Sequence, residues 1–197
     1  MRIIVVGAGG TIGSAVADEL AQRHEVIRVG RHTEPAVDLT DEDSIRALYR
    51  ATGPVDAVIA CTGAVAFKPL AELTHQDFID GFADKGMGQI DLVRIGAQEL
   101  EGPVSYTLTT GVLAQNPIET GTVASAVNGA LESFVTAAAT QLPAGSRINA
   151  VSPNVLAEAP GFHEFFPGFP PVAAKDVALA FVRSVEGVET GRTFQVF

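Results

Sequence analysis

The sequence has little charge, a single cysteine and no long apolar run. Only 18 % of its residues are charged, and 13 Lys and Arg stand against 23 Asp and Glu, which leaves a net charge of −10. A chain this acidic lacks the basic surface that binds a phosphate backbone, so we expect no nucleic-acid partner. The lone cysteine, Cys61, excludes an intrachain disulfide and is typical of a reducing compartment.

Apolar runs are short throughout the chain. None approaches the ~20 residues that a transmembrane helix needs. The first run, residues 3–6, ends at Gly7 and is too short for the apolar region of a secretion signal. We therefore expect a soluble, cytoplasmic protein with no membrane partner.

Hydrophobic residues make up 47 % of the 197 positions, which excludes intrinsic disorder and is enough for one large core. Short β-branched runs alternate with longer helical patterns, an order typical of βαβ units and of a parallel sheet covered on both faces. Residues 1–197 are therefore predicted to form a single doubly wound α/β domain. The predicted strands are 2–6, 24–29, 55–60, 104–110, 147–152 and 193–197. The predicted helices are 11–23, 40–50, 74–101, 120–141 and 174–186.

Capping patterns mark the starts of two of these helices. Thr40 and Thr74 are each followed three positions later by an aspartate, as in a capping box. Within 74–101 apolar or small residues recur at intervals of three and four, which predicts one buried stripe with Lys85 one residue away from it. The stripe consists of Ile79, Ala83, Gly86, Ile90, Val93, Ala97 and Leu100.

One segment, 157–171, interrupts the alternation of strands and helices. It contains four of the eleven Phe, at positions 162, 165, 166 and 169, and four of the eleven Pro. One interpretation is a loop folded against the body of the protein. The other is an apolar flap over a substrate, or an oligomer contact, because long loops in compact domains are often functional lids.

A glycine-rich turn, with the pattern Gly7-x-x-Gly10-x-x-Gly13, lies between the first strand and the first helix. Such a turn is tight, lets a pyrophosphate approach the backbone, and is followed by the free N–H groups of a helix N-terminus. We interpret it as a dinucleotide-binding turn; the alternative is a turn that only packs helix on strand. The predicted cofactor contacts here are Gly7, Gly9, Gly10, Thr11, Ile12 and Gly13.

The end of the second strand indicates which dinucleotide binds. An acidic residue at this place would hydrogen-bond the ribose of NAD, but the chain has Arg31 and His32 instead. Arg31 can hold a 2′-phosphate with two parallel hydrogen bonds, assisted by His32, so we expect NADP(H) in preference to NAD(H). The alternative is that Arg31 is an ordinary solvated charge.

Several segments resemble, in order and spacing, those of the short-chain dehydrogenase/reductase superfamily. Asp38-Leu39-Thr40-Asp41 is similar to its "DVTD" segment, Cys61-Thr62-Gly63 to its "NAG" segment, and 148–154 to its "VNAVSPG" segment. Two further matches are 176–178 and 190–192, the last helix and the "TG" turn.

The resemblance implies a Rossmann-type sheet of about seven strands and an oxidoreductase that acts by hydride transfer. It implies a homodimer or homotetramer formed through the helices 74–101 and 120–141. It places Asp38 at the adenine and makes Leu39 and the segment 61–63 further cofactor contacts. The residues Pro153, Asn154 and Val155 come next to the nicotinamide.

The chain departs from the family where catalysis is expected. Aligned with the family's Tyr-x-x-x-Lys pair, this sequence has Ala124 and Asn128. The family's Ser corresponds to Thr109 or Thr110, with Thr110 preferred from its separation from residue 124, and its Asn falls near Lys85. The resemblance therefore makes Thr110, Lys85 and Asn128 the candidate catalytic residues.

Alanine has no proton to give to a reduced carbonyl. Lys85 is a usable proton donor if it turns inward, because burial lowers the pKa of an amine; otherwise it is a surface lysine. Thr110 can hydrogen-bond a carbonyl oxygen, and Asn128 a substrate or a water. We expect an NADP(H)-dependent oxidoreductase for a small apolar carbonyl or conjugated substrate, without a metal. The alternative is a non-catalytic NADP(H)-binding protein with a regulatory or redox-sensing role.

A deletion can be located from the resemblance. Only six residues separate Arg31 from Asp38, whereas relatives have a complete crossover helix at this place.

Overall fold

The computed structural model describes all 197 residues and contains one six-stranded sheet. Every neighbouring pair of strands is parallel, in the order β2-β1-β3-β4-β5-β6. The strands are β1 (Arg2–Val6), β2 (Glu25–Val29), β3 (Ala57–Ala60), β4 (Ser105–Thr109), β5 (Arg147–Pro153) and β6 (Arg192–Val196).

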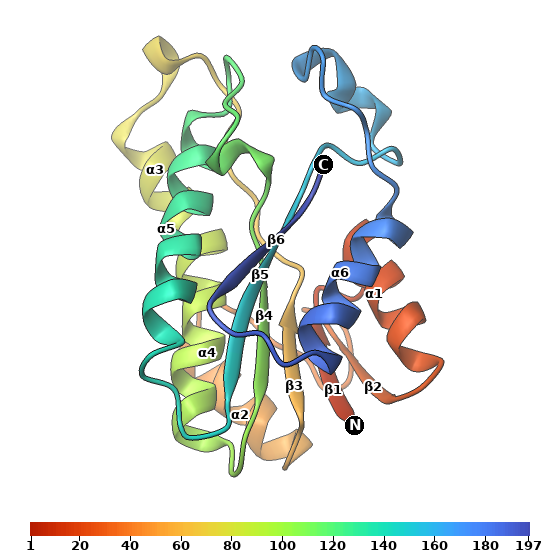
Figure 1. The fold of residues 1–197 in the computed structure, drawn as a ribbon. Coiled ribbons are helices and arrows are strands. Elements are labelled where there is room, and N and C mark those ends of the chain that lie inside the picture. The colour runs from red at the N-terminus through yellow and green to blue at the C-terminus, as the bar shows by residue number, and fades with distance from the viewer.

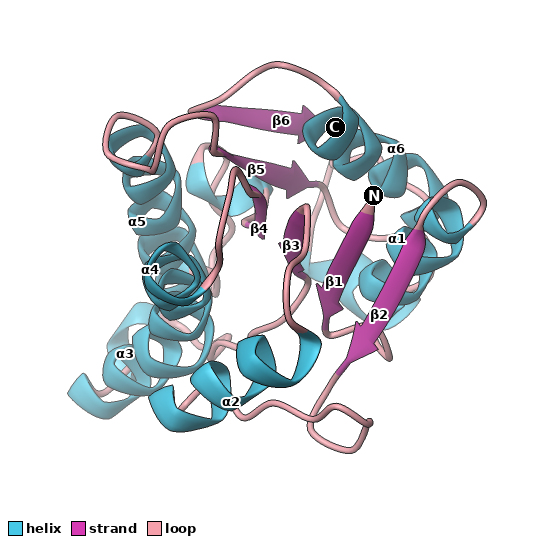
Figure 2. Cartoon of the chain, turned by 90° about the horizontal axis from the view of Figure 1, so that it is seen from below, coloured by secondary structure: helices cyan, strands magenta, loops and turns pink.

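Helices cover both faces of the sheet, as Figures 1 and 2 show. One face carries α1 (Thr11–Ala21) and α6 (Ala174–Glu186), which enclose a core cluster of 14 buried residues. The opposite face carries α2 (Glu42–Thr52), α4 (Gly88–Glu99) and α5 (Thr122–Ala138), which enclose a cluster of 22. Strands buried on two faces are largely apolar, which explains the continuous apolar runs of β1 and β3. β4 and β5 are buried as well but carry polar side chains that bond inside the protein, such as Thr107 and Asn149 to Ser184. The predicted doubly wound α/β fold is confirmed.

The sheet has six strands, close to the seven that the family resemblance implied. β2 is an edge strand, and beyond it lies only an isolated parallel bridge between Gly30 and Ala36. A parallel crossover needs about a dozen residues or more, and the segment 32–37 is too short to make one. The deleted crossover therefore accounts for the lost strand.

The predicted helix 74–101 is one continuous helical region of three parts. It begins with α3 (His75–Gly81), continues through a π-helical turn (Phe82–Met87) and ends with α4. The predicted capping box is present, because Thr74 Oγ1 accepts from the N–H of Asp77 while the Asp77 carboxylate accepts from the N–H of Thr74.

The single buried stripe predicted for this region is wrong. Ile79 is 47 % exposed and Ala83 is exposed as well, whereas Gly86 and Val93 are buried. A π turn takes in an extra residue and so rotates the helix before it relative to the helix after it. The same rotation brings Lys85 inward.

The N-cap of helix α2 (Glu42–Thr52) lies one residue later than predicted, and the capping box predicted at Thr40 is not formed. Asp41 is its N-cap and accepts from the N–H of Asp43, while Thr40 hydrogen-bonds Asp38 instead. No helix of the structure is both long enough and apolar enough to cross a bilayer.

Candidate functional site

Two cavities open at the carboxyl ends of the strands. The larger is a cleft of about 770 Å³ at the end of β1. At this point the strand order reverses, because β2 lies on one side of β1 and β3, the next strand in the chain, on the other. Ligands of doubly wound sheets bind at such a switch point. Eight residues predicted to bind cofactor line this cleft: Gly7, Gly10, Arg31, Asp38, Leu39, Cys61, Thr62 and Gly63.

The glycine turn after β1 is held in place by two close backbone approaches. Gly7 has φ +83°, and a Cβ there would overlap the carbonyl oxygen of Cys61. A Cβ on Gly13 would overlap the carbonyl oxygen of Gly7. Neither position accepts a side chain, so both glycines shape the turn. Gly7 lines the cleft and Gly13 does not.

Helix α1 begins at the larger cleft, which its N-cap lines. Its N-cap, Gly10, has no side chain to bond the first N–H groups, and a Cβ there would meet nothing closer than 3.4 Å. Thr62, which lines the same cleft next to Gly7, has an Oγ1 that is buried without a hydrogen-bond partner. Free helix N–H groups suit a pyrophosphate and an unpaired hydroxyl suits a polar ligand, so these residues fit a dinucleotide.

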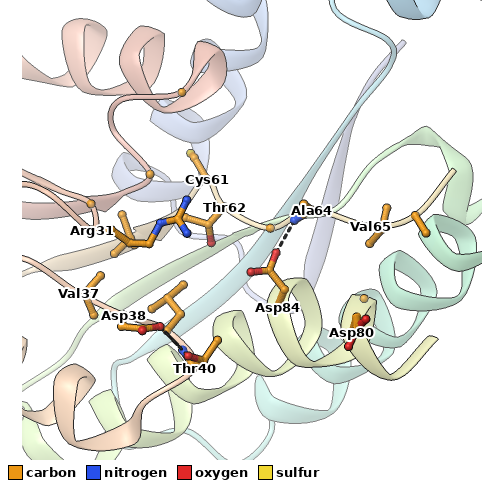
Figure 3. Close-up of a pocket in the computed structure, with 18 of the residues that line it drawn as sticks. Arg31, Val37, Asp38, Thr40, Cys61, Thr62, Ala64, Val65, Asp80 and Asp84 are labelled. Carbon is orange, nitrogen blue, oxygen red and sulfur yellow. Dashed lines mark hydrogen bonds between the residues drawn. The ribbon is translucent and has the colours of Figure 1, made fainter. Parts of the chain in front are cut away.

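Figure 3 shows Arg31 extending from the end of β2 toward the segment of Cys61 and Thr62. Its guanidinium takes part in none of the ion pairs of the structure. Across the cleft, the Asp38 carboxylate accepts from the Thr40 hydroxyl at 2.7 Å and from its N–H at 2.9 Å. These hydrogen bonds, with a smaller contribution from the Arg31 charge, lower the pKa of Asp38.

An acidic wall of the cleft was not predicted. Asp77, Asp80 and Asp84 line it from the helical region after β3. Asp84 points at the loop after β3 and accepts the N–H of Ala64 at 2.6 Å (Figure 3). The three- and four-residue spacing of these aspartates is the signal in the sequence that places them on one side of a helix.

The smaller cavity, of about 270 Å³, brings the three candidate catalytic residues together. Lys85 comes from the π turn, Thr110 from the end of β4 and Asn128 from α5. Ala124 lines the same cavity. So do four of the residues predicted to bind cofactor: Ile12, Pro153, Asn154 and Val155.

Lys85 is the only charged residue that lines this cavity. Its Nζ lies 3.4 Å from the carbonyl oxygen of Thr110, and burial lowers its pKa to about 8. A Cβ on Gly63 would overlap the Lys85 side chain, so the loop after β3 contacts this lysine directly. Because Gly63 lines the larger cleft and Lys85 the smaller cavity, the two cavities adjoin here.

Glu132 is a residue that the sequence reasoning missed. Its Oε1 lies 3.0 Å from Thr110 Oγ1, and Gln115 Nε2 donates to its other oxygen. Burial raises the pKa of Glu132. The signal in the sequence is its spacing, four residues after Asn128 and eight after Ala124, which places all three on one face of α5.

Aromatic side chains close the apolar end of the smaller cavity. Phe162 and Phe166 line it from the segment 157–171, and Phe162 meets Phe67 edge to face at 6.1 Å between ring centroids. Phe166 is only 8 % exposed. Two of the four phenylalanines of this segment therefore form part of the cavity wall.

Four other predicted residues do not line either cavity: Gly9, Thr11, Gly13 and His32.

Two residues predicted to contact the cofactor, Cys61 and Val155, are buried or hydrogen-bonded within the protein. Burial raises the pKa of the Cys61 thiol to about 12, which leaves it unreactive. At the predicted nicotinamide contact, the N–H of Val155 bonds Asn154 Oδ1 and its carbonyl accepts from Val172.

Comparisons with known proteins agree with this architecture. A sequence model of the family described as enoyl-(acyl carrier protein) reductase matches residues 6–191. The crystal structure of the protein lin1944 from Listeria innocua shares 45 % identity over 100 % of both chains, with a TM-score of 0.97. A small-chain dehydrogenase shares 26 % identity over 100 % of this chain and 95 % of its own, with a TM-score of 0.85. A small-chain dehydrogenase in complex with NADPH has the same fold, at 24 % identity over 100 % of this chain and 96 % of its own (TM-score 0.86). No curated protein matches the chain.

Proposed function

Because the chain belongs to the short-chain dehydrogenase/reductase superfamily of oxidoreductases, we propose that it transfers hydride between NADP(H) and a small, largely apolar carbonyl or conjugated compound. One observation carries the proposal. Lys85, Thr110 and Asn128 come from three separate elements and line one mostly apolar cavity that adjoins the cofactor cleft. Scattered surface residues would have no reason to meet in this way.

The larger cleft supplies the contacts that a dinucleotide requires. The N-terminus of α1 would hold the pyrophosphate, Arg31 the 2′-phosphate and Asp38 the adenine. NADPH, when bound, supplies the hydride. The preference for NADP(H) is supported by the unpaired guanidinium of Arg31 and by the similar dehydrogenase that was solved with NADPH.

Lys85 is the group proposed to supply the proton. A carbonyl that becomes an alcohol needs a proton on its oxygen, and Ala124 stands where the family resemblance expects the donor. With a pKa of about 8, the Lys85 ammonium is mostly protonated at neutral pH and is a stronger acid than an exposed lysine. It therefore combines the correct protonation state with a position at the cavity.

A second candidate function is favoured by the same Ala124. If no other group donates a proton, the chain is a non-catalytic NADP(H) binder with a regulatory or redox-sensing role. The two candidates differ only in turnover, since both require the cofactor cleft.

A fluorescence titration with NADPH, followed by turnover assays, tests both functions. The chain has no Trp, so NADPH fluorescence is read against a weak protein signal. We expect saturable binding and consumption of NADPH with at least one member of a panel of carbonyls and quinones. Binding without consumption across the panel would overturn the enzyme in favour of the binder. Absence of NADPH binding would overturn both.

We also propose self-association as a homodimer or homotetramer through the helices 74–101 and 120–141. Large apolar side chains on the first of these are exposed: Ile79 at 47 %, Phe82 at 37 % and Met87 at 45 %. Sedimentation analysis should show dimers or larger species, and Ile79→Glu should shift them toward the monomer. Val188→Glu, at a loop residue that is 90 % exposed, is the matched control and should not. A monomeric wild type would contradict the proposal.

A further inference from the structure

We propose that Glu132 is a positioning residue that directs the hydroxyl proton of Thr110 away from the cavity, so that the site selects carbonyl compounds with a hydroxyl group on the neighbouring carbon. This inference rests on the proposed function and deepens it by naming a substrate class.

The Thr110 hydroxyl donates its hydrogen bond to Glu132. Thr110 is 3 % exposed, and its Oγ1 lies 3.0 Å from Glu132 Oε1. An ionised carboxylate has no proton and can only accept, so the Thr110 hydroxyl donates. The other acceptor within reach, the carbonyl oxygen of Val151 at 3.4 Å, is also inside the protein. A hydroxyl has one proton, and Thr110 therefore offers only lone pairs to a ligand.

Glu132 is held in the orientation that this requires. Gln115 Nε2 donates to its second oxygen, and an amide nitrogen cannot accept. Burial opposes the charge, whereas the hydrogen bonds from Thr110 and Gln115 favour the ionised form. The carboxylate is thus a fixed acceptor for Thr110 and does not itself line the cavity.

Asn128, in the wall of the same cavity, has an acceptor without a partner. Asn128 is 3 % exposed, and its Oδ1 has no hydrogen-bond partner. A buried polar atom without a partner costs about 1–3 kcal/mol, so a ligand that brings a donor is favoured. Lys85 provides the cationic donor for a carbonyl oxygen, and Thr110 an acceptor for a neighbouring O–H.

The rest of the cavity defines the rest of the ligand. Its wall is largely apolar and includes Phe67, Leu113, Phe162 and Phe166. A compact aromatic or aliphatic group suits this surface, whereas a second charge would be desolvated without a partner. An aryl ketone with a hydroxyl on the adjacent carbon combines these features.

The experiment compares 2-hydroxyacetophenone with 2-methoxyacetophenone, each with NADPH. Both keep an oxygen beside the carbonyl, but only the first has a proton to donate. We expect kcat/KM for the hydroxy ketone to be about tenfold higher in the wild type, the usual effect of one hydrogen bond to a buried group. Equal values for the two ketones would overturn the inference.

Variants separate positioning from a merely structural role. In Glu132→Gln, the new amide nitrogen can donate to Thr110 Oγ1 and release its proton toward the ligand, so the ratio of the two kcat/KM values should fall close to one. Thr110→Val should abolish the ratio as well. Glu72→Gln makes the same charge change at an exposed residue outside both cavities and should keep the ratio. An unchanged ratio in Glu132→Gln, whatever its overall rate, would overturn the assignment.

A binding measurement distinguishes failure of this inference from failure of the proposed function. The Kd of each ketone is measured by ligand-observed NMR on the protein with NADP⁺, which cannot reduce it. Tighter binding of the hydroxy ketone without any NADPH consumption would support the selection and count against the enzyme. Consumption of NADPH without preference for either ketone would overturn the selection alone.

Discussion

The two cavities are built from different parts of the chain. One part of the wall of the larger cleft is backbone: a glycine turn, a helix N-terminus and the loop after β3. The smaller cavity is made of side chains that arrive from the π turn, β4, α5 and the segment 157–171. Backbone walls depend on positions where no Cβ fits, so they leave a strict pattern in the sequence. A side chain that lines a wall can be replaced by another without a change of fold. Here Ala124 occupies the position where the family resemblance expects the proton donor, and Lys85 lines the same cavity.

The largest effect is expected at the single cation of the smaller cavity. Lys85→Met keeps the length of the side chain and removes its proton, so turnover of a carbonyl substrate should fall by about 10²–10⁴-fold. NADPH affinity should change little, since Lys85 does not line the larger cleft. Steady-state kinetics and the fluorescence titration measure the two separately.

Lys175→Met, at an exposed lysine of α6, is the control and should keep both turnover and affinity. Full activity of Lys85→Met would remove this residue from the chemistry and would leave the smaller cavity without its proposed acid.

The backbone walls are tested at Gly13. In Gly13→Ala the new Cβ overlaps the carbonyl oxygen of Gly7, and neither backbone segment can move freely. We expect the free energy of unfolding to drop by about 3 kcal/mol, the upper end for overpacking, together with loss of NADPH binding. Urea unfolding and the titration measure these. Gly9→Ala, where nothing lies within 4 Å, should change neither; equal losses in both variants would contradict the reason given.

Cofactor selectivity is tested at Arg31. Charge-assisted hydrogen bonds contribute about 1.5–3 kcal/mol, so Arg31→Gln should weaken NADPH binding by about 10–100-fold and leave NADH binding nearly unchanged. His32→Gln is the neighbouring control, because His32 lines neither cavity. Equal weakening of both cofactors would show that Arg31 acts on the shape of the cleft and not on the 2′-phosphate.

A smaller, graded effect is expected with pH. Burial lowers the pKa of Lys85 to about 8, and the protonated form is the proposed acid. The rate of carbonyl reduction should therefore be level below that pH and fall about tenfold per pH unit above it. The falling limb should be absent from the residual activity of Lys85→Met. A wild-type profile that stays flat through the alkaline range would contradict the role of this ammonium.

Much of the fold could be predicted because local signals agree with the tertiary structure. The strand 2–6 and the helix 174–186 were predicted with the bounds that the structure has. The helical region 74–101 was predicted in extent but wrong in its buried face, because an ordinary helical period does not anticipate a π turn. The exposed Ile79 and the inward Lys85 both follow from that turn.

The candidate site was predictable where individual residues aligned with the family's catalytic motif. The residues at the three candidate catalytic positions were named from the sequence, and they line one cavity. Glu132 was not, because its partner Thr110 is 22 residues away along the chain. A contact between two polar residues at that separation leaves no periodic trace, and only the packing of α5 beside the end of β4 brings them together.

The sequence by itself determined the alternation of strands and helices, the tight turn at Gly7–Gly13 and the position of Arg31 after β2. These features depend on residues close together in the chain. There the spacing of apolar residues determines the type of secondary structure, and glycine, which has no Cβ, permits the tight turn. Only the tertiary structure decided that Lys85 turns inward, that it meets Thr110 and Asn128, and that Glu132 accepts from Thr110. Those outcomes depend on burial and on distances between segments far apart in the chain, which no local pattern specifies.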